Sequence, residues 1–183
     1  RTVEQLFEQF EEADESEQGQ IAERVCQLLT VHAQIEEEIF YPAAKEAFED
    51  EEEHDLVNEA EVEHASAKDL IAKIEAMSPG DEQFKATVKV LSEYIKHHVK
   101  EEENEMFPEI KKTELDLKEL GSQLMDRKLT LMEELGIEQE TEEEAPPAKK
   151  RSRSSGSSRS AARSGARRRS SNASKRSGSR ASR

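Results

Sequence analysis

Two segments of the sequence repeat one arrangement of histidine, glutamate, aromatic and proline residues, 66 positions apart. The first reads HAQIEEEIFYP and begins at His32, and the second reads HVKEEENEMFP and begins at His98. In each segment a glutamate, Glu36 or Glu102, follows the histidine by four residues. Residues four apart share one face of an α-helix, so each segment presents an imidazole and a carboxylate together. The repeat therefore favours a fold in which two such helices face each other.

The first 144 residues have the composition of a helical protein. Glu, Lys, Ala, Leu and Gln dominate, while Gly and Pro are rare before Pro146. We expect Pro42 and Pro108 to kink or stop their helices and Gly136 to cap the last one. The predicted helices cover residues 1–13, 18–48, 52–77, 82–111 and 115–135.

Apolar residues recur at steps of three and four in three of these helices, which is typical of a bundle seam. Histidine and glutamate occupy seam positions where Leu or Ile would be expected. The seams are Ala22, Val25, Leu29, His32 and Glu36; His64, Ala67, Ile71 and Ile74; and Val88, Leu91, Ile95, His98 and Glu102. The first helix matches the third at an offset of 64, so the repeat predicts a further histidine immediately before Arg1. Because the sequence begins with Arg1 rather than Met, we expect it to be a fragment.

Five inward-facing polar residues need a partner, because burying an unpaired imidazole or carboxylate is costly. One interpretation is a set of buried His–Glu hydrogen bonds that tie helices together. The joint pattern on three helices favours a metal site. A ferritin-like site needs Glu-x-x-His motifs on two helices, whereas the motifs ending at His54 and His64 lie on one.

The ligand chemistry favours iron. Nitrogen and oxygen ligands without sulfur suit iron, and also manganese or zinc, but the ligands outnumber those of one tetrahedral zinc. We predict two iron ions per chain, bridged by Glu36 and Glu102, with the histidine before Arg1 as a sixth ligand. The five metal ligands predicted within the chain are His32, Glu36, His64, His98 and Glu102.

These segments, with the sequence EAEVEH that ends at His64, resemble the hemerythrin-like HHE cation-binding family over residues 1–135. The resemblance implies an all-α, antiparallel four-helix bundle, here with an additional C-terminal helix, around a non-haem di-iron centre with the same five ligands. O2-carrying members have two histidines four apart on the third helix and an aspartate five residues after the last histidine. Here Ala60 and Lys68 stand four residues either side of His64, and Glu102 comes only four residues after its histidine. These departures favour sensing, redox or iron-handling roles over reversible O2 carriage.

Other polar residues near the seams receive less specific interpretations. His97 is turned about 100° around its helix from the adjacent ligand histidine, so we expect it at the surface. Glu37 and Glu101 are candidates to orient ligands, although an exposed glutamate is the commoner outcome. Tyr41 is expected to close one end of the bundle, and Cys26 to be a small buried hydrophobe.

Charge divides the chain. All 42 acidic residues precede Ala145 and 13 of the 27 basic residues follow it, so the first 144 residues carry −28 and the tail carries +13. The tail has no Leu, Ile, Val, Phe or Met, and we expect it to be disordered. We predict two parts, the helical bundle over residues 1–135 and an acidic linker with a Ser/Arg-rich tail over residues 136–183. The charge of residues 145–183 suits sequence-independent binding of nucleic acid, and it equally suits folding back on the acidic domain.

The sequence predicts a non-haem di-iron protein that binds or senses O2, NO or peroxide, or handles iron. One alternative is a di-iron oxidoreductase, either a ferroxidase or a peroxidase. Another is a DNA-associated protein that acts through the basic tail. The single cysteine excludes an internal disulfide, and no apolar run is long enough to span a membrane, so we expect a cytoplasmic protein.

Overall fold

The computed structural model describes residues 2–137, and every regular element among them is helical, which confirms the all-α prediction. The chain divides into two units, Arg1–Glu143 and Glu144–Arg183. The basic tail, predicted to be disordered, lies outside the described residues. The helices are α1 (Thr2–Glu12), α2 (Glu15–Ile35), η1 (Glu36–Phe40), α3 (Tyr41–Ala47), α4 (Glu51–Glu75), α5 (Phe84–Glu101), η2 (Glu102–Met106), α6 (Phe107–Ile110) and α7 (Leu117–Glu134). Among residues 2–137, no helix combines the length and apolar character needed to cross a bilayer.

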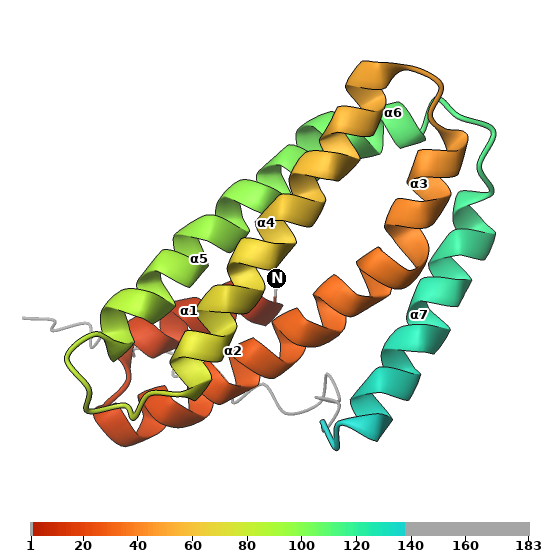
Figure 1. Cartoon of the computed structure of the whole chain (residues 1–183). Coiled ribbons are helices and arrows are strands. Elements are labelled where there is room, and N and C mark those ends of the chain that lie inside the picture. Colours follow the sequence, from red (N-terminus) through yellow and green to blue (C-terminus); the bar gives the residue numbers. More distant parts are fainter. Residues whose placement is uncertain (1, 138–183) are drawn as a thin grey trace, which may run out of the picture. The chain divides into compact units, whose positions relative to one another are not determined.

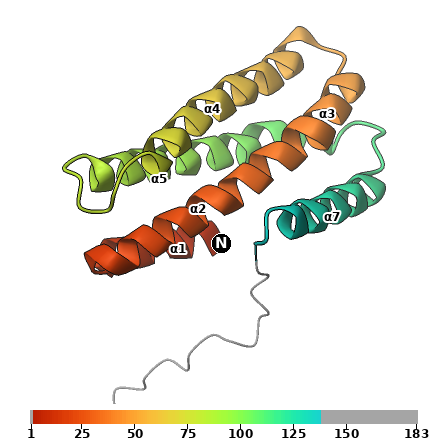
Figure 2. The same cartoon turned by 60° about the horizontal axis from the view of Figure 1, so that its bottom comes forward.

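The helices pack as two hairpins that face each other. Helix α1 packs on α2, and α4 packs on α5, while further contacts join α2 to α4 and α1 to α5 (Figures 1 and 2). The interior contains two apolar clusters, one built around Val25, Leu29 and Leu91 and the other around Tyr41, Val57 and Met106. Along each of the three long helical paths, the histidines predicted as ligands fall between these clusters. The apolar packing therefore fixes the helices on both sides of a polar layer.

Helix starts depend on capping that the apolar pattern does not reveal. Helix α2 begins three residues earlier than predicted, because Asp14 and Glu17 form a capping box: the Asp14 carboxylate accepts from the backbone N–H of Glu17, and the Glu17 carboxylate accepts from that of Asp14. Asp50 and Glu53 form the same motif before α4. These caps satisfy backbone N–H groups that the first helical turn leaves without partners.

Two π-helical turns interrupt the long helices just before the prolines. The α-helical pattern stops at Ile35 and at Glu101, and Pro42 and Pro108 each stand in the first turn of a new α-helical segment, α3 or α6, directly after the π-turn η1 or η2. In η1 the N–H of Tyr41 donates to the carbonyl of Glu36, five residues back. A proline ring clashes with the carbonyl four residues before it in an α-helix, and a π-turn changes that spacing. The helical path therefore continues through both prolines.

Helix α7 is an addition that covers the outer face of α2 (Figures 1 and 2). Its Leu131 and Met132 form an apolar cluster with Val31 and Ile35 of α2 and with Ile137. At the surface, Arg127 of α7 donates from Nε to Glu38 at 2.6 Å and from Nη2 at 3.2 Å. Gly136 ends the helix with a φ of 64°, as expected for a C-terminal cap, and this turns Ile137 back onto the cluster.

Candidate metal centre

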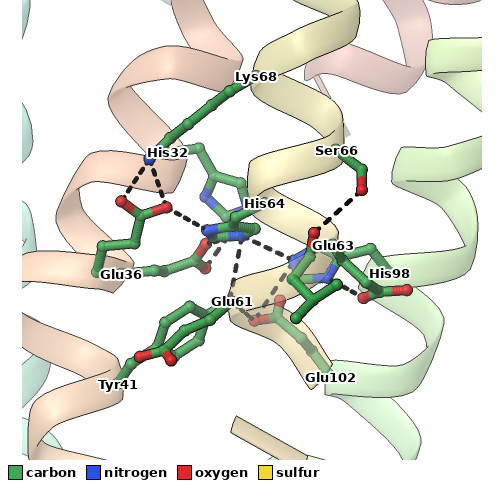
Figure 3. A network of polar contacts seen from close by, with 12 residues as sticks. His32, Glu36, Tyr41, Glu61, Glu63, His64, Ser66, Lys68, His98 and Glu102 are labelled. Carbon is green, nitrogen blue, oxygen red and sulfur yellow. Dashed lines mark hydrogen bonds and ion pairs between the residues drawn. The ribbon is translucent and has the colours of Figure 1, made fainter. Parts of the chain in front are cut away.

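The five residues predicted as metal ligands come together in the layer between the two apolar clusters (Figure 3). Their inward atoms lie close to one another: His64 Nε2 is 3.1 Å from His98 Nε2 and 3.5 Å from Glu36 Oε2. His32 Nε2 is 3.4 Å from Glu36 Oε1, and His98 Nε2 is 3.7 Å from Glu102 Oε1. The side chains of four of them are buried, and that of His32 is 41% exposed. The fold therefore brings all five side chains to one place.

A carboxylate holds the outer nitrogen of each central histidine. His98 Nδ1 lies 2.7 Å from Glu63 Oε2, and His64 Nδ1 lies 3.1 Å from Glu37 Oε1. Glu37 in turn accepts from Lys68 Nζ at 2.7 Å. An ionised carboxylate only accepts hydrogen bonds, so it pairs with a ring that carries a proton on Nδ1. In the neutral form of such a ring Nε2 is unprotonated, and here the Nε2 atoms of both rings face inward, as is usual for histidines that bind metals.

Two unprotonated nitrogens 3.1 Å apart repel each other unless a cation lies beside them. The neighbouring phenol of Tyr41 has one proton, which it donates to Glu102 Oε1 at 3.1 Å. When both rings are neutral and the phenol proton points to Glu102, neither His64 nor His98 accepts a hydrogen bond from the other ring or from this phenol. In that state the two Nε2 atoms are suited to bind a cation.

The buried carboxylates of the group are also suited to bind a cation. Glu36 Oε2 is buried and has no hydrogen-bond partner within the described residues. Burial, with repulsion from Glu102, raises the pKa of Glu36 well above its usual value, and burial also raises the pKa of Glu102. Burial and the neighbouring His98 lower the pKa of His64. A bound cation would offset the cost of burying the ionised carboxylates, and it would bind the neutral imidazole that the lowered pKa of His64 already favours.

His32 lies at the edge of the group, beside a cavity of about 330 Å³. The apolar wall of the cavity includes Phe7 of α1 and Val99 of α5, and lysines stand on its rim. Although part of its side chain is exposed to this cavity, burial and repulsion from His64 and His98 lower the pKa of His32 to about 4. The neutral imidazole that results is the form that binds metals.

Sequence reasoning missed two residues of the site, Tyr41 and Glu63. The Tyr41 hydroxyl is fully buried and lies 3.1 Å from His64 Nε2 as well as from Glu102 Oε1, instead of closing the end of the bundle. In an α-helix Tyr41 would be turned about 140° from Glu36. The π-turn between them brings it back to the inward face. The proline after Tyr41 was the one signal in the sequence that the helix departs from α geometry.

The remaining candidates lie outside the layer. His97 is 61% exposed on its side chain and pairs with Glu101 at 3.0 Å, as a surface residue would. Glu101 therefore pairs with a surface histidine, whereas Glu37 lies beside Nδ1 of the predicted ligand His64. His54 packs edge-on against Phe48. The ligand atoms of Glu63, His97 and Glu101 also lie within 4.8 Å of one another, on the outer side of His98.

Sequence similarity relates this chain to known proteins. A DNA nickase of Nostoc sp. is 32% identical over 83 residues, which is 45% of this chain and 22% of that protein. The chain therefore spans about a fifth of the length of that relative. No solved structure matches. The family described as hemerythrin HHE cation binding domain matches residues 1–110, more than half of the sequence, and the chain belongs to this family.

Proposed function

We propose that this chain is a non-haem di-iron protein whose centre binds a small ligand such as O2, NO or peroxide. The observation that carries the proposal is the pair of inward Nε2 atoms of His64 and His98, 3.1 Å apart, with a carboxylate beside the Nδ1 atom of each ring on the outer side. Family membership supports a bound metal cation. Iron, when bound, supplies a redox couple and open coordination positions for the small ligand. The antiparallel four-helix arrangement over residues 1–135 is part of the same proposal.

Two overlapping groups of ligand atoms support two ions rather than one. Glu36, His64 and His98 form one group, and His32, Glu36 and Glu102 form the other, with the atoms of each within 4.8 Å of one another. Glu36 belongs to both groups, so its two carboxylate oxygens are suited to bridge two cations. The nitrogen and oxygen donors fit iron, which accepts more ligands than a tetrahedral zinc.

Adjacent histidines provide the test. The full chain would be loaded with Fe(II) without oxygen, and its iron content would be measured for the wild type, His98→Ala and His97→Ala. We expect His98→Ala to lose at least one iron per chain, because its Nε2 faces the centre. His97→Ala should retain the full content, because its ring faces solvent. Equal iron content in the two variants, or zinc in place of iron after growth with ample iron, contradicts the proposal.

The same protein separates binding from catalysis. Stoichiometric consumption of H2O2 by the loaded chain indicates a binding or sensing protein, whereas repeated turnover indicates a peroxidase.

A second candidate function is association with DNA through residues 145–183. The 13 basic residues of this segment favour it, and a DNA nickase is among the relatives. Binding to random duplex DNA should require these residues and should weaken by about 10³-fold or more between about 50 and about 200 mM salt. Equal binding by the full chain and by a chain ending at residue 144 would exclude the tail. Absence of binding by the full chain at low salt would favour a tail that pairs with the acidic domain.

A further inference from the structure

One buried hydroxyl reaches the inward atoms of the centre. Tyr41 is 0% exposed, and its Oη lies 3.1 Å from both His64 Nε2 and Glu102 Oε1 (Figure 3). Its ring packs on that of His64, with 5.2 Å between the ring centroids, and on Phe40 at 5.6 Å. These contacts fix where the hydroxyl points, so the phenol is held ready to act at this place.

The hydroxyl differs chemically from everything else that faces the centre. The predicted ligands present nitrogen lone pairs and carboxylate oxygens, and these atoms carry no proton toward a metal once they bind it. Among residues 2–137, Tyr41 is the side chain outside the ligand set that brings an O–H group within 3.1 Å of those inward atoms. A small ligand in the centre that needs a hydrogen bond would therefore find its donor here.

The internal repeat shows that the donor exists on one side alone. Phe107 stands 66 residues after Tyr41, at the same place after the π-turn η2. It packs against Phe40, with ring centroids 5.6 Å apart, and has no hydroxyl. The two halves of the centre thus share their histidine and glutamate but differ in this one oxygen. Tyr41→Phe gives the first half the aromatic residue that the second half already has.

We propose that Tyr41 determines which small ligands the centre prefers, because its hydroxyl donates a hydrogen bond to an anionic ligand. This rests on the proposed function, because it requires a metal centre with an open position. The phenol exchanges its bond to Glu102 for one to the anion, and no covalent bond changes. Anions such as azide accept hydrogen bonds strongly, whereas neutral NO accepts them weakly, so the phenol favours the anion.

The test compares two ligands in three proteins. The full iron-loaded chain, Tyr41→Phe and the control Tyr94→Phe would be titrated with azide and with NO, followed by absorption spectra, after iron content has been measured. Tyr94 is half-buried and packs beside the apolar cluster around Leu91. We expect Tyr41→Phe to keep its iron and its NO affinity but to lose azide affinity by about tenfold or more, the value of a hydrogen bond to a charged group. Tyr94→Phe should match the wild type.

Each other outcome has a distinct meaning. Unchanged azide affinity in Tyr41→Phe overturns the assignment, while retained iron and NO binding leave the proposed di-iron function standing. An equal loss of azide and NO affinity also overturns it, because this indicates general distortion of the centre. Loss of iron in Tyr41→Phe would show that the phenol acts only by holding Glu102. A wild type that binds no iron refutes the proposed function itself.

Discussion

Replacing Glu36 by glutamine should stabilise the metal-free protein and weaken its metal binding. In the described structure Glu36 Oε2 is buried without a hydrogen-bond partner, and Glu102 adds like-charge repulsion. A buried polar atom left unpaired costs about 1–3 kcal/mol. Glutamine has the same shape and carries no charge, and its amide N–H group can donate to the Nε2 atom of His64, 3.5 Å from the present oxygen. We therefore expect Glu36→Gln to raise the unfolding free energy of the metal-free protein by about 1–3 kcal/mol.

Bound metal should make the wild type more stable than Glu36→Gln, the reverse of the order expected without metal. A ligand that binds only the folded state adds about 4 kcal/mol when its free concentration is about 1,000 times its Kd. The wild type should gain this stabilisation, and the glutamine variant should gain far less, because it lacks the carboxylate shared by both ligand groups. Urea denaturation with a chelator, and then with Fe(II) under anaerobic conditions, measures both orders. Glu93→Gln, at an exposed position of α5, is the control and should change stability by less than about 0.5 kcal/mol. If the metal-free Glu36→Gln protein is less stable than the wild type, Glu36 has a stabilising partner and the reasoning is wrong.

Three further predictions concern the scaffold. Gly121→Ala should raise the unfolding free energy by about 0.5–1 kcal/mol, because a Cβ there meets no atom within 4 Å. Gly19→Ala should lack this gain, because its Cβ would lie 2.7 Å from Pro79 Cγ. Equal urea midpoints for the two variants would contradict this. Leu131→Ala should cost about 2–5 kcal/mol in urea unfolding, because this leucine is 2% exposed, and a loss below about 1 kcal/mol would mean that α7 is not firmly packed. Burial raises the pKa of Cys26 to about 12. Its thiol should therefore resist a thiol reagent at pH 8 until urea unfolds the chain, and rapid labelling of the folded chain would contradict the burial. The stability that the neutral thiol contributes should be complete below its ordinary pKa of 9.0 and should be lost as pH rises toward 12, as measured against Cys26→Ala.

The sequence predicted those parts of the centre that follow α-helical periodicity. His32 shares a face with the apolar residues of α2, and His98 shares one with those of α5, because the spacing of 3.6 residues per turn holds up to these positions. The all-helical composition was equally direct, because strands need an alternation that the chain lacks. These features depend on residues close in sequence, so local sequence patterns are sufficient to predict them.

The missed features depend on departures from that period or on contacts between helices. Tyr41 enters the centre only because a π-turn lies between it and Glu36. Glu63 is adjacent to the predicted ligand His64 on α4, and its contact appears only when α5 brings His98 to 2.7 Å from its carboxylate. The early start of α2 could have been predicted from the sequence, since Asp14 and a glutamate three residues later form a known capping pattern. The position of α7 on α2 follows from tertiary packing, which helical periodicity alone does not specify.

Helix α7 makes the two repeated halves of the centre unequal in polarity. On α2, Val31 and Ile35 lie under α7 and are shielded from water. The equivalent positions on α5, 66 residues later, are His97 and Glu101, which water reaches. At this level the outer face of α2 is therefore covered by hydrocarbon, whereas the matching face of α5 carries charged groups that solvent screens. The repeat thus has one outer face buried under α7 and one open to water.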